Sequence, residues 1–354
     1  MADVSIHPAK LERYAAAVLA AAGMPEDDAA TAARSLVDAN LRGVDSHGIV
    51  RLLPYVTKIE QGGTNPRPAI TFVRDRAATA VVDGDHGMGQ VVGTFAMQAA
   101  IERARTYGIG MVVAKGSEHY GAAAFYAQMA TEHGMIGFAS TNAPPVMAPW
   151  GGMAQSIGNN PVAFAVPTRT PPAIVLDMSM SRVAGGRVRL AAKKGERIPD
   201  GWIVDKHGVP STDPADLPDG ALLAEGHKGY GLAVIVEALC GALSGAAMLS
   251  EIPNWLFQPT KATNTGHAFI AMDIDHFVDV DEFLDRIETM RAELHAVPPA
   301  AGVERVLLPG DIEAGLSERR AEGLPIPAEV HADLLELGRR YGIDTGVITT
   351  AIPV

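Results

Sequence analysis

The chain has 354 residues, of which 47% are hydrophobic and 20% charged, a balance typical of globular proteins. Its 29 Lys and Arg residues against 41 Asp and Glu residues give a formal net charge of −12, which argues against nucleic acid and anionic membranes as main partners. The length exceeds the usual size of one compact core, so we expect two or three domains.

Cysteine usage and the chain start bear on the compartment. The single cysteine, Cys240, lies in an apolar helical run and is expected to be a buried core thiol. A lone cysteine forms no internal disulfide, which fits the cytosol. The N-terminus has neither a basic nor an apolar leader region, and no apolar stretch reaches the roughly 18 residues of a membrane helix. We therefore expect a cytoplasmic protein without a membrane partner.

The first half of the chain predicts helices followed by alternating strands and helices. Residues 8–22 and 26–42 read as two helices, and 54–68 as a turn-rich connector. The predicted elements then run strand, helix, strand, helix, strand, at 78–82, 90–106, 110–114, 122–133 and 136–141. This rhythm indicates an α/β region.

The second half is richer in turns. We expect short strands, a turn-rich stretch at 195–227, a helix, a further strand and two final helices. The expected strands and helices are 163–166, 173–176, 230–243, 267–273, 280–296 and 328–341.

Two segments place a histidine beside glycine, where its side chain can face an open cleft. The first is 45–51, in which Arg51 follows His47 by four residues, a spacing that puts both on one face of a helix. A proton donor and a fixed cation on one face suit a substrate with a carboxylate beside a reactive carbon.

The second segment, 116–121, lies between a predicted strand and a predicted helix. Free backbone N–H groups at the helix start predict an anion site, and Gly121 would let a phosphate approach closely. His119 would lie at the mouth of that site. A plain surface loop remains the alternative.

Other residues give weaker signals. Asp177 closes a strand and could face a ligand crevice or cap a helix. Lys228 could contact a phosphate or a ribose hydroxyl, or be a solvated loop lysine. The turn at 158–161 could orient a polar substrate. The glycines of 87–93 resemble a dinucleotide fingerprint, but the third is one position late and the acidic ribose contact is missing.

The residue types present suggest two further chemistries, a metal centre and a hydrolytic triad. His47, His119 and Asp177 could converge on a metal, but the chain has no His-Glu-x-x-His helix and no paired cysteines. Ser46, His47 and Asp177 could form a hydrolytic triad, but no Gly-x-Ser-x-Gly elbow surrounds Ser46. We expect neither a metal centre nor a hydrolase.

Taken in chain order, these segments resemble the malate/L-lactate dehydrogenase family, whose fold is not the Rossmann fold. That family includes ureidoglycolate and sulfolactate dehydrogenases, diketogulonate reductase and piperideine-2-carboxylate reductase. The resemblance covers nearly the whole chain, and its motifs are 45–51, 116–122, 149–152, 158–161, 176–179, 198–202, 210–214, 226–231 and 308–310.

The resemblance implies an α/β fold like that of sulfolactate dehydrogenase, with a largely antiparallel cofactor-domain sheet and a helical N- and C-terminal layer. The implied domains are a helical layer of 1–65 with 297–354, a small α/β substrate or dimer region of 66–114, and an NAD(P)-binding domain of 115–296. It also implies a homodimer.

The resemblance implies catalytic roles for four residues. His47 would be the acid/base, supported by Ser46, and Arg51 would hold the substrate carboxylate. His119 is assigned as the acid/base in some members. Asn159 would lie near the substrate.

The resemblance also implies which residues contact NAD or NADP. They lie in four segments. In chain order, these would line the cofactor site near the substrate, contact the nicotinamide half, contact the ribose or phosphate, and contact the far end of the cofactor. The residues are His119, Tyr120, Gly121 and Ala122, then Asp177, Met178 and Ser179, then Lys228 and Gly229, and finally Pro309, Gly310 and Asp311.

The chain departs from the family in three places. Ala143 stands where some members have a serine that touches the cofactor. Residues 224–226 replace a common glycine pair. The stretch 248–260, which contains Trp255 and Phe257, varies widely in the family, and we expect it to shape substrate choice.

The resulting expectation is an NAD(P)-dependent oxidoreductase that interconverts a 2-oxo acid and a 2-hydroxy acid. An alternative is reduction of cyclic or N-alkyl 2-imino acids, which requires the same carboxylate contact. A catalytically silent ligand-binding protein on the same scaffold is the alternative from another class.

Overall fold

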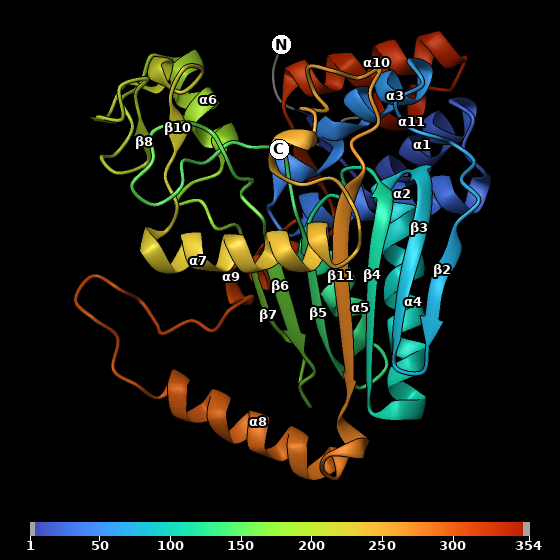
Figure 1. The fold of residues 1–354 in the computed structure, drawn as a ribbon, viewed down its shortest axis with the longest axis vertical. Helices are drawn as coiled ribbons and strands as arrows, with labels where there is room; N and C mark the ends of the chain where they lie inside the picture. Colours follow the sequence, from blue (N-terminus) through green and yellow to red (C-terminus); the bar gives the residue numbers. More distant parts are fainter. Residues whose placement is uncertain (1–3, 350–354) are drawn as a thin grey trace.

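The computed structural model describes residues 4–349 and combines a central sheet with a helical layer, a small lobe and an outlying helix (Figure 1). Within those residues, no helix is both long enough and apolar enough to cross a membrane.

The central sheet has seven strands in the order β2-β3-β4-β11-β5-β6-β7. Every pairing is antiparallel except the parallel pair of β3 and β4. The expected α/β fold with a largely antiparallel sheet is thereby confirmed. The strands are β2 (Thr71–Arg76), β3 (Thr79–Gly87), β4 (Ile109–Ser117), β5 (Met135–Thr141), β6 (Val162–Val166), β7 (Ile174–Met178) and β11 (Thr265–Asp273).

The predicted strand–helix alternation is present, with α4 (Gly89–Tyr107) between β3 and β4 and α5 (Ala123–Thr131) between β4 and β5. The late strand β11 inserts between β4 and β5 and pairs antiparallel with both. Phe269 of β11 packs in the apolar cluster formed with α4 and α5, whereas Ala268 packs in the cluster on the opposite face. Both faces of the central strand are therefore covered, and its apolar sequence fits that position.

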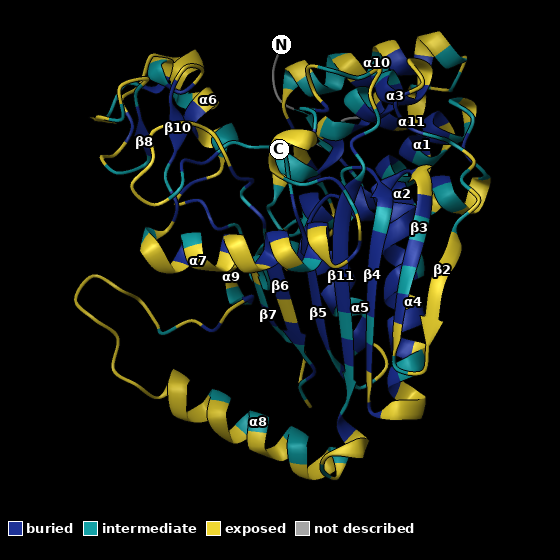
Figure 2. Cartoon of the chain, viewed as in Figure 1, coloured by how far each residue is buried: buried dark blue, intermediate teal, exposed yellow. Residues whose placement is uncertain are grey.

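The other face of the sheet is crossed by α7 (Gly226–Glu237), which continues into a π-helical turn at Ala238–Ala242 (Figure 1). Cys240 in this turn is buried, as expected. Beside it stands the small lobe with α6 (Gly185–Lys194) and three two-residue strands, β8 (Ile203–Val204), β9 (Pro210–Ser211) and β10 (Ala221–Leu222). α8 (Val280–His295) has no buried residue and lies apart from the sheet (Figure 2).

The helical layer joins the two ends of the chain. Strand β1 (Val4–Ile6) pairs antiparallel with β12 (Leu324–Ile326), and helices from both ends share one apolar cluster. This confirms the expected N- and C-terminal layer. Its helices are α1 (Pro8–Ala21), α2 (Glu26–Leu41), α3 (Leu52–Glu60), α10 (Ala328–Tyr341) and α11 (Gly346–Thr349), with α9 (Asp311–Arg319) packed on α2.

Two expectations about local structure were wrong. The connector expected at 54–68 is helical up to Glu60, since Pro54 lies in the first turn of α3, where its missing N–H costs no hydrogen bond. Helix α7 begins at Gly226 rather than at residue 230.

The expected division into three domains stays a prediction. Strands β2 to β4, from the expected region 66–114, share one sheet with strands of the expected region 115–296. The outermost residues of the expected helical layer, 1–3 and 350–354, lie outside the described residues.

The close packing of helices on the sheet yields a stability prediction. A Cβ at Gly137 of β5 would lie 2.0 Å from the carbonyl oxygen of Ala127 in α5. A Cβ at Gly110 of β4 would likewise lie 2.0 Å from the carbonyl oxygen of Ala100 in α4. Gly137→Ala should lower the free energy of unfolding by about 2 kcal/mol or more, because backbone must move. Chemical denaturation measures this.

The matched control is Gly315→Ala in α9, where the new methyl group would meet only the end of the Arg319 side chain at 3.4 Å. It should leave stability unchanged or raise it by up to about 1 kcal/mol, since alanine favours helix. Equal stability of the two variants would contradict the packing argument.

Candidate active site

The first histidine segment forms two short 3₁₀ turns, Asp45–His47 and Ile49–Arg51. Gly48 between them is extended, with φ −85° and ψ −150°. The expectation that His47 and Arg51 share one continuous helical face was therefore wrong. The buried Asn40 of α2 holds both turns, since its amide donates to Asp45 Oδ1 at 2.7 Å and accepts from the Ile49 N–H at 2.7 Å.

His47 and Arg51 are nevertheless held together by Ser46. The Ser46 hydroxyl lies 2.9 Å from His47 Nδ1, and Arg51 Nε donates to the Ser46 carbonyl oxygen at 2.7 Å. Among residues 4–349, neither His47 Nε2 nor the two Nη atoms of Arg51 have a hydrogen-bond partner. One imidazole nitrogen and the outer edge of one guanidinium thus remain available to a ligand.

His119 stacks against His47, with ring centroids 5.5 Å apart and an interplanar angle of 19°. Its Nδ1 lies 2.7 Å from the Tyr55 hydroxyl, which in turn accepts from Gln90 Nε2 at 3.0 Å. Tyr55 and Gln90 are buried, whereas the two histidines are partly exposed. The two imidazoles predicted from separate motifs therefore form one cluster, and a chain of hydrogen bonds fixes the second one.

Trp255 covers this cluster from the stretch 248–260. Its ring stacks on His119 at 4.7 Å and lies 5.4 Å from Arg51 Cζ. The indole is buried, whereas Phe257 is 78% exposed. Of the two aromatic residues singled out in the sequence, Trp255 alone contacts the cluster.

A buried ion pair includes Glu118, the residue before His119. Lys58 of α3 pairs with Glu118, and each side chain is 3% exposed. Lys58 Nζ also donates to the Gly63 carbonyl oxygen at 2.6 Å, and Glu118 accepts from the N–H and hydroxyl of Thr263 at 2.9 and 2.7 Å. This pair links the helical layer to the segments that precede α5 and β11.

The electrostatics keep both imidazoles uncharged. Loss of hydration, followed by the positive charge of Arg51, lowers the pKa of His47 to about 4. Loss of hydration, together with His47 and Arg51, also lowers the pKa of His119 well below its usual value. Both histidines are neutral at pH 7 and can accept a proton or donate one N–H.

The expected anion site at the start of α5 is partly used by the protein itself. Asp177, at the end of β7, accepts from the Ala124 N–H at 2.8 Å. It therefore caps α5 from a neighbouring strand, and no hydrogen bond joins it to either histidine. Although the side chain is exposed, the surrounding protein reduces its hydration and raises its pKa to about 6.

The other segments expected to contact the cofactor gather around β7. The Pro309 carbonyl oxygen accepts from the Val175 N–H at 3.0 Å, and Gly310, with φ +95°, packs directly on Val175. Only glycine adopts this conformation so close to a strand without strain.

Met180, just beyond the end of β7, contacts two more of these segments. The Met180 N–H donates to the Asn159 carbonyl oxygen at 2.8 Å, and the Met180 carbonyl oxygen accepts from the Glu225 N–H at 2.9 Å, just before Lys228. Lys228 is exposed and has no ion pair among the described residues. Contacts therefore join residues 119–124, 174–180, 225–229 and 309–311 around this strand, and their exposed atoms make up the surface around β7.

The backbone of that surface suits an extended dinucleotide. It offers close approach at Gly226 (φ +61°), where no atom lies within 4 Å of a built Cβ. At the buried Gly121 (φ +82°), the Gln90 and Ser35 side chains already lie 3.3 Å from a built Cβ. Backbone N–H groups and the Lys228 ammonium can donate to phosphates, and the exposed Asp177 carboxylate can accept from ribose hydroxyls. Among residues 4–349, no group of three His, Cys, Asp or Glu side chains is placed to hold a metal ion.

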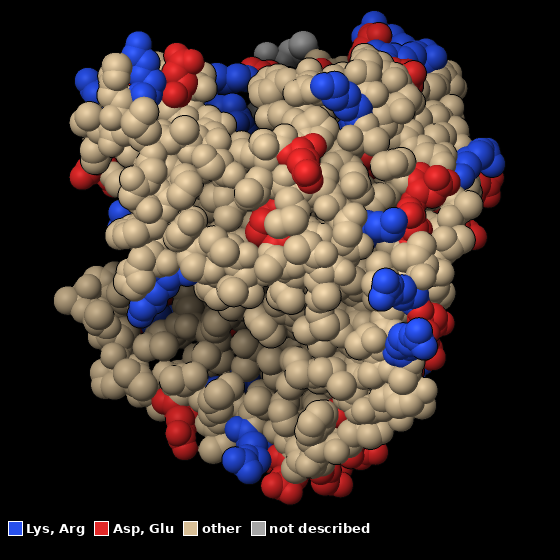
Figure 3. Space-filling model, viewed as in Figure 1, with Lys and Arg blue, Asp and Glu red and all other residues tan. Residues whose placement is uncertain are grey.

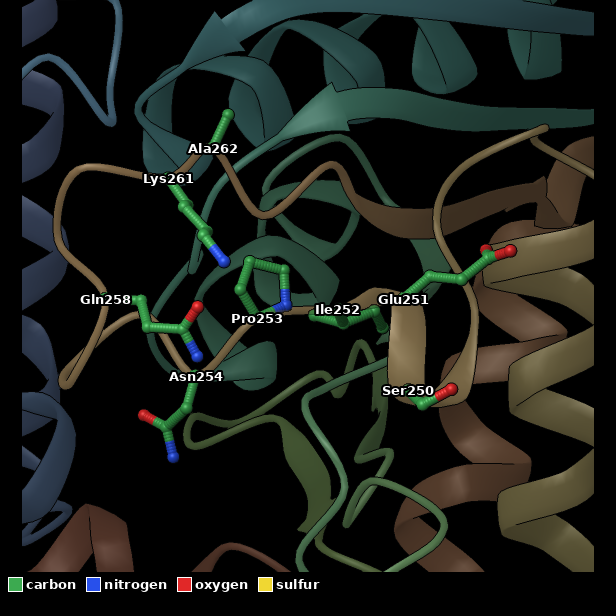
Figure 4. A pocket seen from close by; sticks show the side chains of 8 residues that line it. All are labelled: Ser250, Glu251, Ile252, Pro253, Asn254, Gln258, Lys261 and Ala262. Atoms are coloured by element: carbon green, nitrogen blue, oxygen red, sulfur yellow. The ribbon is translucent and has the colours of Figure 1, made fainter.

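A pocket of about 630 Å³ lies beside Trp255 (Figure 4). None of the residues expected to act in catalysis or to contact the cofactor lines it. Gln258 and Lys261 extend toward its centre in Figure 4. The pocket belongs to the loop that carries Trp255, and its lining is Ser250, Glu251, Ile252, Pro253, Asn254, Gln258, Lys261 and Ala262.

Tyr55, Gln90 and Lys58 are three site residues that were not predicted from the sequence. Tyr55 lies four residues after Arg51, so a helix starting at 52 would have placed it beside that arginine. Gln90 and Lys58 carry no such signal, since each acts through a tertiary contact.

Comparison with known proteins decides the family. The model for malate/L-lactate dehydrogenase matches residues 6–335. The chain belongs to this malate/L-lactate dehydrogenase family. It is 39% identical to a malate dehydrogenase of Pyrococcus horikoshii over 345 residues, 95% of either chain.

Solved structures of the family agree with this fold. The sulfolactate dehydrogenase of Methanocaldococcus jannaschii has a TM-score of 0.91 and 37% identity, over 96% of this chain and 98% of that one. A Δ1-piperideine-2-carboxylate reductase of Pseudomonas syringae has a TM-score of 0.85 and 28% identity, over 94% and 99%.

Two relatives in the malate/L-lactate dehydrogenase family carry a cofactor in their names. Ureidoglycolate dehydrogenase (NAD(+)) of Escherichia coli is 33% identical over 90% of this chain and 91% of its own. (2R)-3-sulfolactate dehydrogenase (NADP(+)) of Chromohalobacter salexigens is 36% identical over 91% and 95%. The expected enzyme class, a dehydrogenase or reductase dependent on NAD or NADP, is thus confirmed for the family.

The buried ion pair gives a second prediction. Glu118→Gln leaves the Lys58 ammonium buried without its counter-charge, so the free energy of unfolding should fall by about 3–5 kcal/mol. Chemical denaturation measures the loss. Glu102→Gln, which breaks the exposed pair with Arg105, is the control and should change stability by less than about 1 kcal/mol. Equal losses in the two variants would contradict the structural role of the buried pair.

Proposed function

We propose that this protein is an NAD(P)-dependent oxidoreductase that interconverts a 2-oxo acid and a 2-hydroxy acid, with a histidine as acid/base. The observation that carries the proposal is the pair of stacked imidazoles beside an Arg51 guanidinium whose outer nitrogens have no partner among the described residues. Membership of a family whose relatives are named for malate, sulfolactate and ureidoglycolate supports the same substrate class.

Arg51 is suited to hold the carboxylate next to the reacting carbon. Its Nε is fixed by Ser46 and its Cζ lies over the Trp255 ring, so the guanidinium is held in place before the substrate arrives. A carboxylate bound by two parallel N–H bonds is held in one orientation. The carbon beside it would then face the imidazoles.

The two histidines are suited to different tasks. Tyr55 accepts from Gln90, so its own hydroxyl proton is free to bond His119 Nδ1, which leaves the proton of neutral His119 on Nε2. His119 would then donate a hydrogen bond to the substrate oxygen. His47 Nδ1 faces the Ser46 hydroxyl, which donates or accepts, so His47 Nε2 is free to take and return the proton.

NAD or NADP would supply or accept the hydride, and residues of this chain would hold it. The surface around β7 would bind it, with Lys228 and Gly229 on one side and Pro309, Gly310 and Asp311 on the other. Asp177, Met178 and Ser179 would contact the nicotinamide half, and Asn159 would lie near the substrate. His119, Tyr120, Gly121 and Ala122 connect this surface to the imidazoles.

Reduction of a cyclic or N-alkyl 2-imino acid is the second candidate, because the structurally similar Pseudomonas syringae protein is named for such a substrate. Arg51 and the imidazoles would serve it equally well. A silent ligand-binding protein is disfavoured, since His47, Arg51, His119 and Lys228 would then have no reason to be present together.

We also expect a homodimer located in the cytoplasm. Leu232, Ile235 and Leu243 are 47%, 57% and 56% exposed along α7 and the turn that follows it, and a second copy would cover such an apolar surface. The single buried Cys240 is the feature of the chain that suits a reducing compartment.

The assignment of the acid/base is testable by comparing two variants. His47→Gln should lower kcat by about 10²–10⁴, the usual effect of removing a positioned acid/base. His119→Gln should cost less, because an amide N–H still donates to the substrate oxygen. Both activities are measured as NADH and NADPH consumption with a panel of 2-oxo acids and cyclic imines, and cofactor titration by fluorescence confirms binding. A fully active His47→Gln would refute the assignment.

The depressed pKa of His47 predicts the pH dependence of hydroxy acid oxidation. Oxidation requires neutral His47, so kcat/KM should rise with pH through about 4 and stay level between about 6 and 8. Arg51→Gln removes one of the two causes of the low pKa, so its inflection should move to higher pH. Initial rates across mixed buffers give both profiles, with activity recovered on return to pH 7 as the stability check. An inflection near 6.5 in the unmodified protein would contradict the argument.

A further inference from the structure

One side of α6 faces the helical layer across a hollow. Gly186, Arg189 and Lys193 follow at intervals of three and four residues, so they share this face. A Cβ on Gly186 would lie 4.0 Å from Ser46 Cβ, and Lys193 Nζ lies 3.4 Å from Glu329 Oε2 of α10. Arg189 lies on α6 between these two contacts. In Figure 3, Lys or Arg atoms line the hollow between the α6 lobe and the helical layer.

Two acidic groups near this face are engaged with other partners. Glu329 pairs with Lys193, and Asp45 pairs with Arg320 at 2.9 Å and with Asn40. Arg189 is exposed and has no hydrogen bond or ion pair to any residue in 4–349.

Arg189 and Arg51 are close enough to repel each other. Loss of hydration is the main cause that lowers the pKa of Arg51, and the charge of Arg189 lowers it further. The α6 face that reaches Ser46 therefore adds a second guanidinium charge to the region of Arg51, and Arg189 has no acidic partner among residues 4–349. A ligand with an anionic group at each end would relieve this repulsion.

We propose that Arg189 is a specificity-determining residue that binds a second anionic group of the substrate while Arg51 holds the carboxylate beside the reacting carbon. The preferred substrates are then 2-oxo and 2-hydroxy acids with a terminal carboxylate or sulfonate. This inference rests on the proposed function and adds to it a named residue and a charge requirement.

The test compares two four-carbon 2-oxo acids that differ in the second charge. Oxaloacetate carries a terminal carboxylate, and 2-oxobutyrate carries a methyl group instead. kcat/KM is measured for both with NADH and with NADPH in the unmodified protein, Arg189→Gln, Arg51→Gln and Arg187→Gln. Arg187 is the matched control, since it is an exposed arginine of α6 on a different face of the helix. Thermal unfolding midpoints confirm that each variant is folded.

We expect the unmodified protein to prefer oxaloacetate. Arg189→Gln should lower kcat/KM for oxaloacetate by about 10- to 100-fold, the effect of losing a charged hydrogen bond, and change that for 2-oxobutyrate by less than about threefold. Arg51→Gln should lower kcat/KM for both substrates. Arg187→Gln should leave kcat/KM for both substrates unchanged.

Three results with an active enzyme would overturn the inference and leave the proposed function standing. They are a preference for 2-oxobutyrate in the unmodified protein, an equal effect of Arg189→Gln on both substrates, and a raised KM for the cofactor in that variant, which would assign Arg189 to a cofactor phosphate. A protein that binds neither cofactor, or that reduces no 2-oxo acid, would overturn the proposed function itself.

Discussion

The site depends on keeping two imidazoles uncharged next to a permanent cation. Arg51 lies within reach of both histidines, and no carboxylate hydrogen-bonds to His47 or His119 among the described residues. Because a like charge and lost hydration both disfavour the imidazolium, proton affinity is low until an anion arrives. A carboxylate bound to Arg51 would offset its charge and raise the proton affinity of the imidazoles. In the proposed function, substrate binding and proton transfer would thereby be coupled through one guanidinium.

The fold assembles this site from segments far apart in the chain. β11 enters the sheet between β4 and β5 and brings Thr263, just ahead of it, against Glu118. The same buried carboxylate pairs with Lys58 of α3, which fixes the helix that carries Tyr55. Since Tyr55 in turn bonds His119, the sheet, the helical layer and the imidazole are joined by consecutive polar contacts. Displacing any of these segments would move His119.

The sequence predicted the parts of the site that depend on local pattern. The helices at 8–22, 26–42 and 328–341 and the strand–helix alternation follow from apolar periodicity, and the structure has them. The insertion of β11 has no local signal, because pairing between strands about 150 residues apart depends on the whole sheet. Likewise, the sequence left Asp177 as either a ligand residue or a helix cap, and identifying α5 as the helix that it caps requires knowing that β7 ends beside that helix. Trp255 lies in a stretch noted for variability, and only packing distinguishes it from the exposed Phe257.

The charge distribution reconciles an acidic protein with an anionic substrate. A formal net charge of −12 opposes the approach of large polyanions. A small anion responds to the local field, because charges beyond about 8–10 Å are screened at physiological salt. In the proposal for α6, that local field would come from Arg51 and Arg189, while Asp45 and Glu329 are already paired with Arg320 and Lys193. Selectivity for small dianions therefore needs no positive net charge, only two arginines whose acidic neighbours are occupied elsewhere.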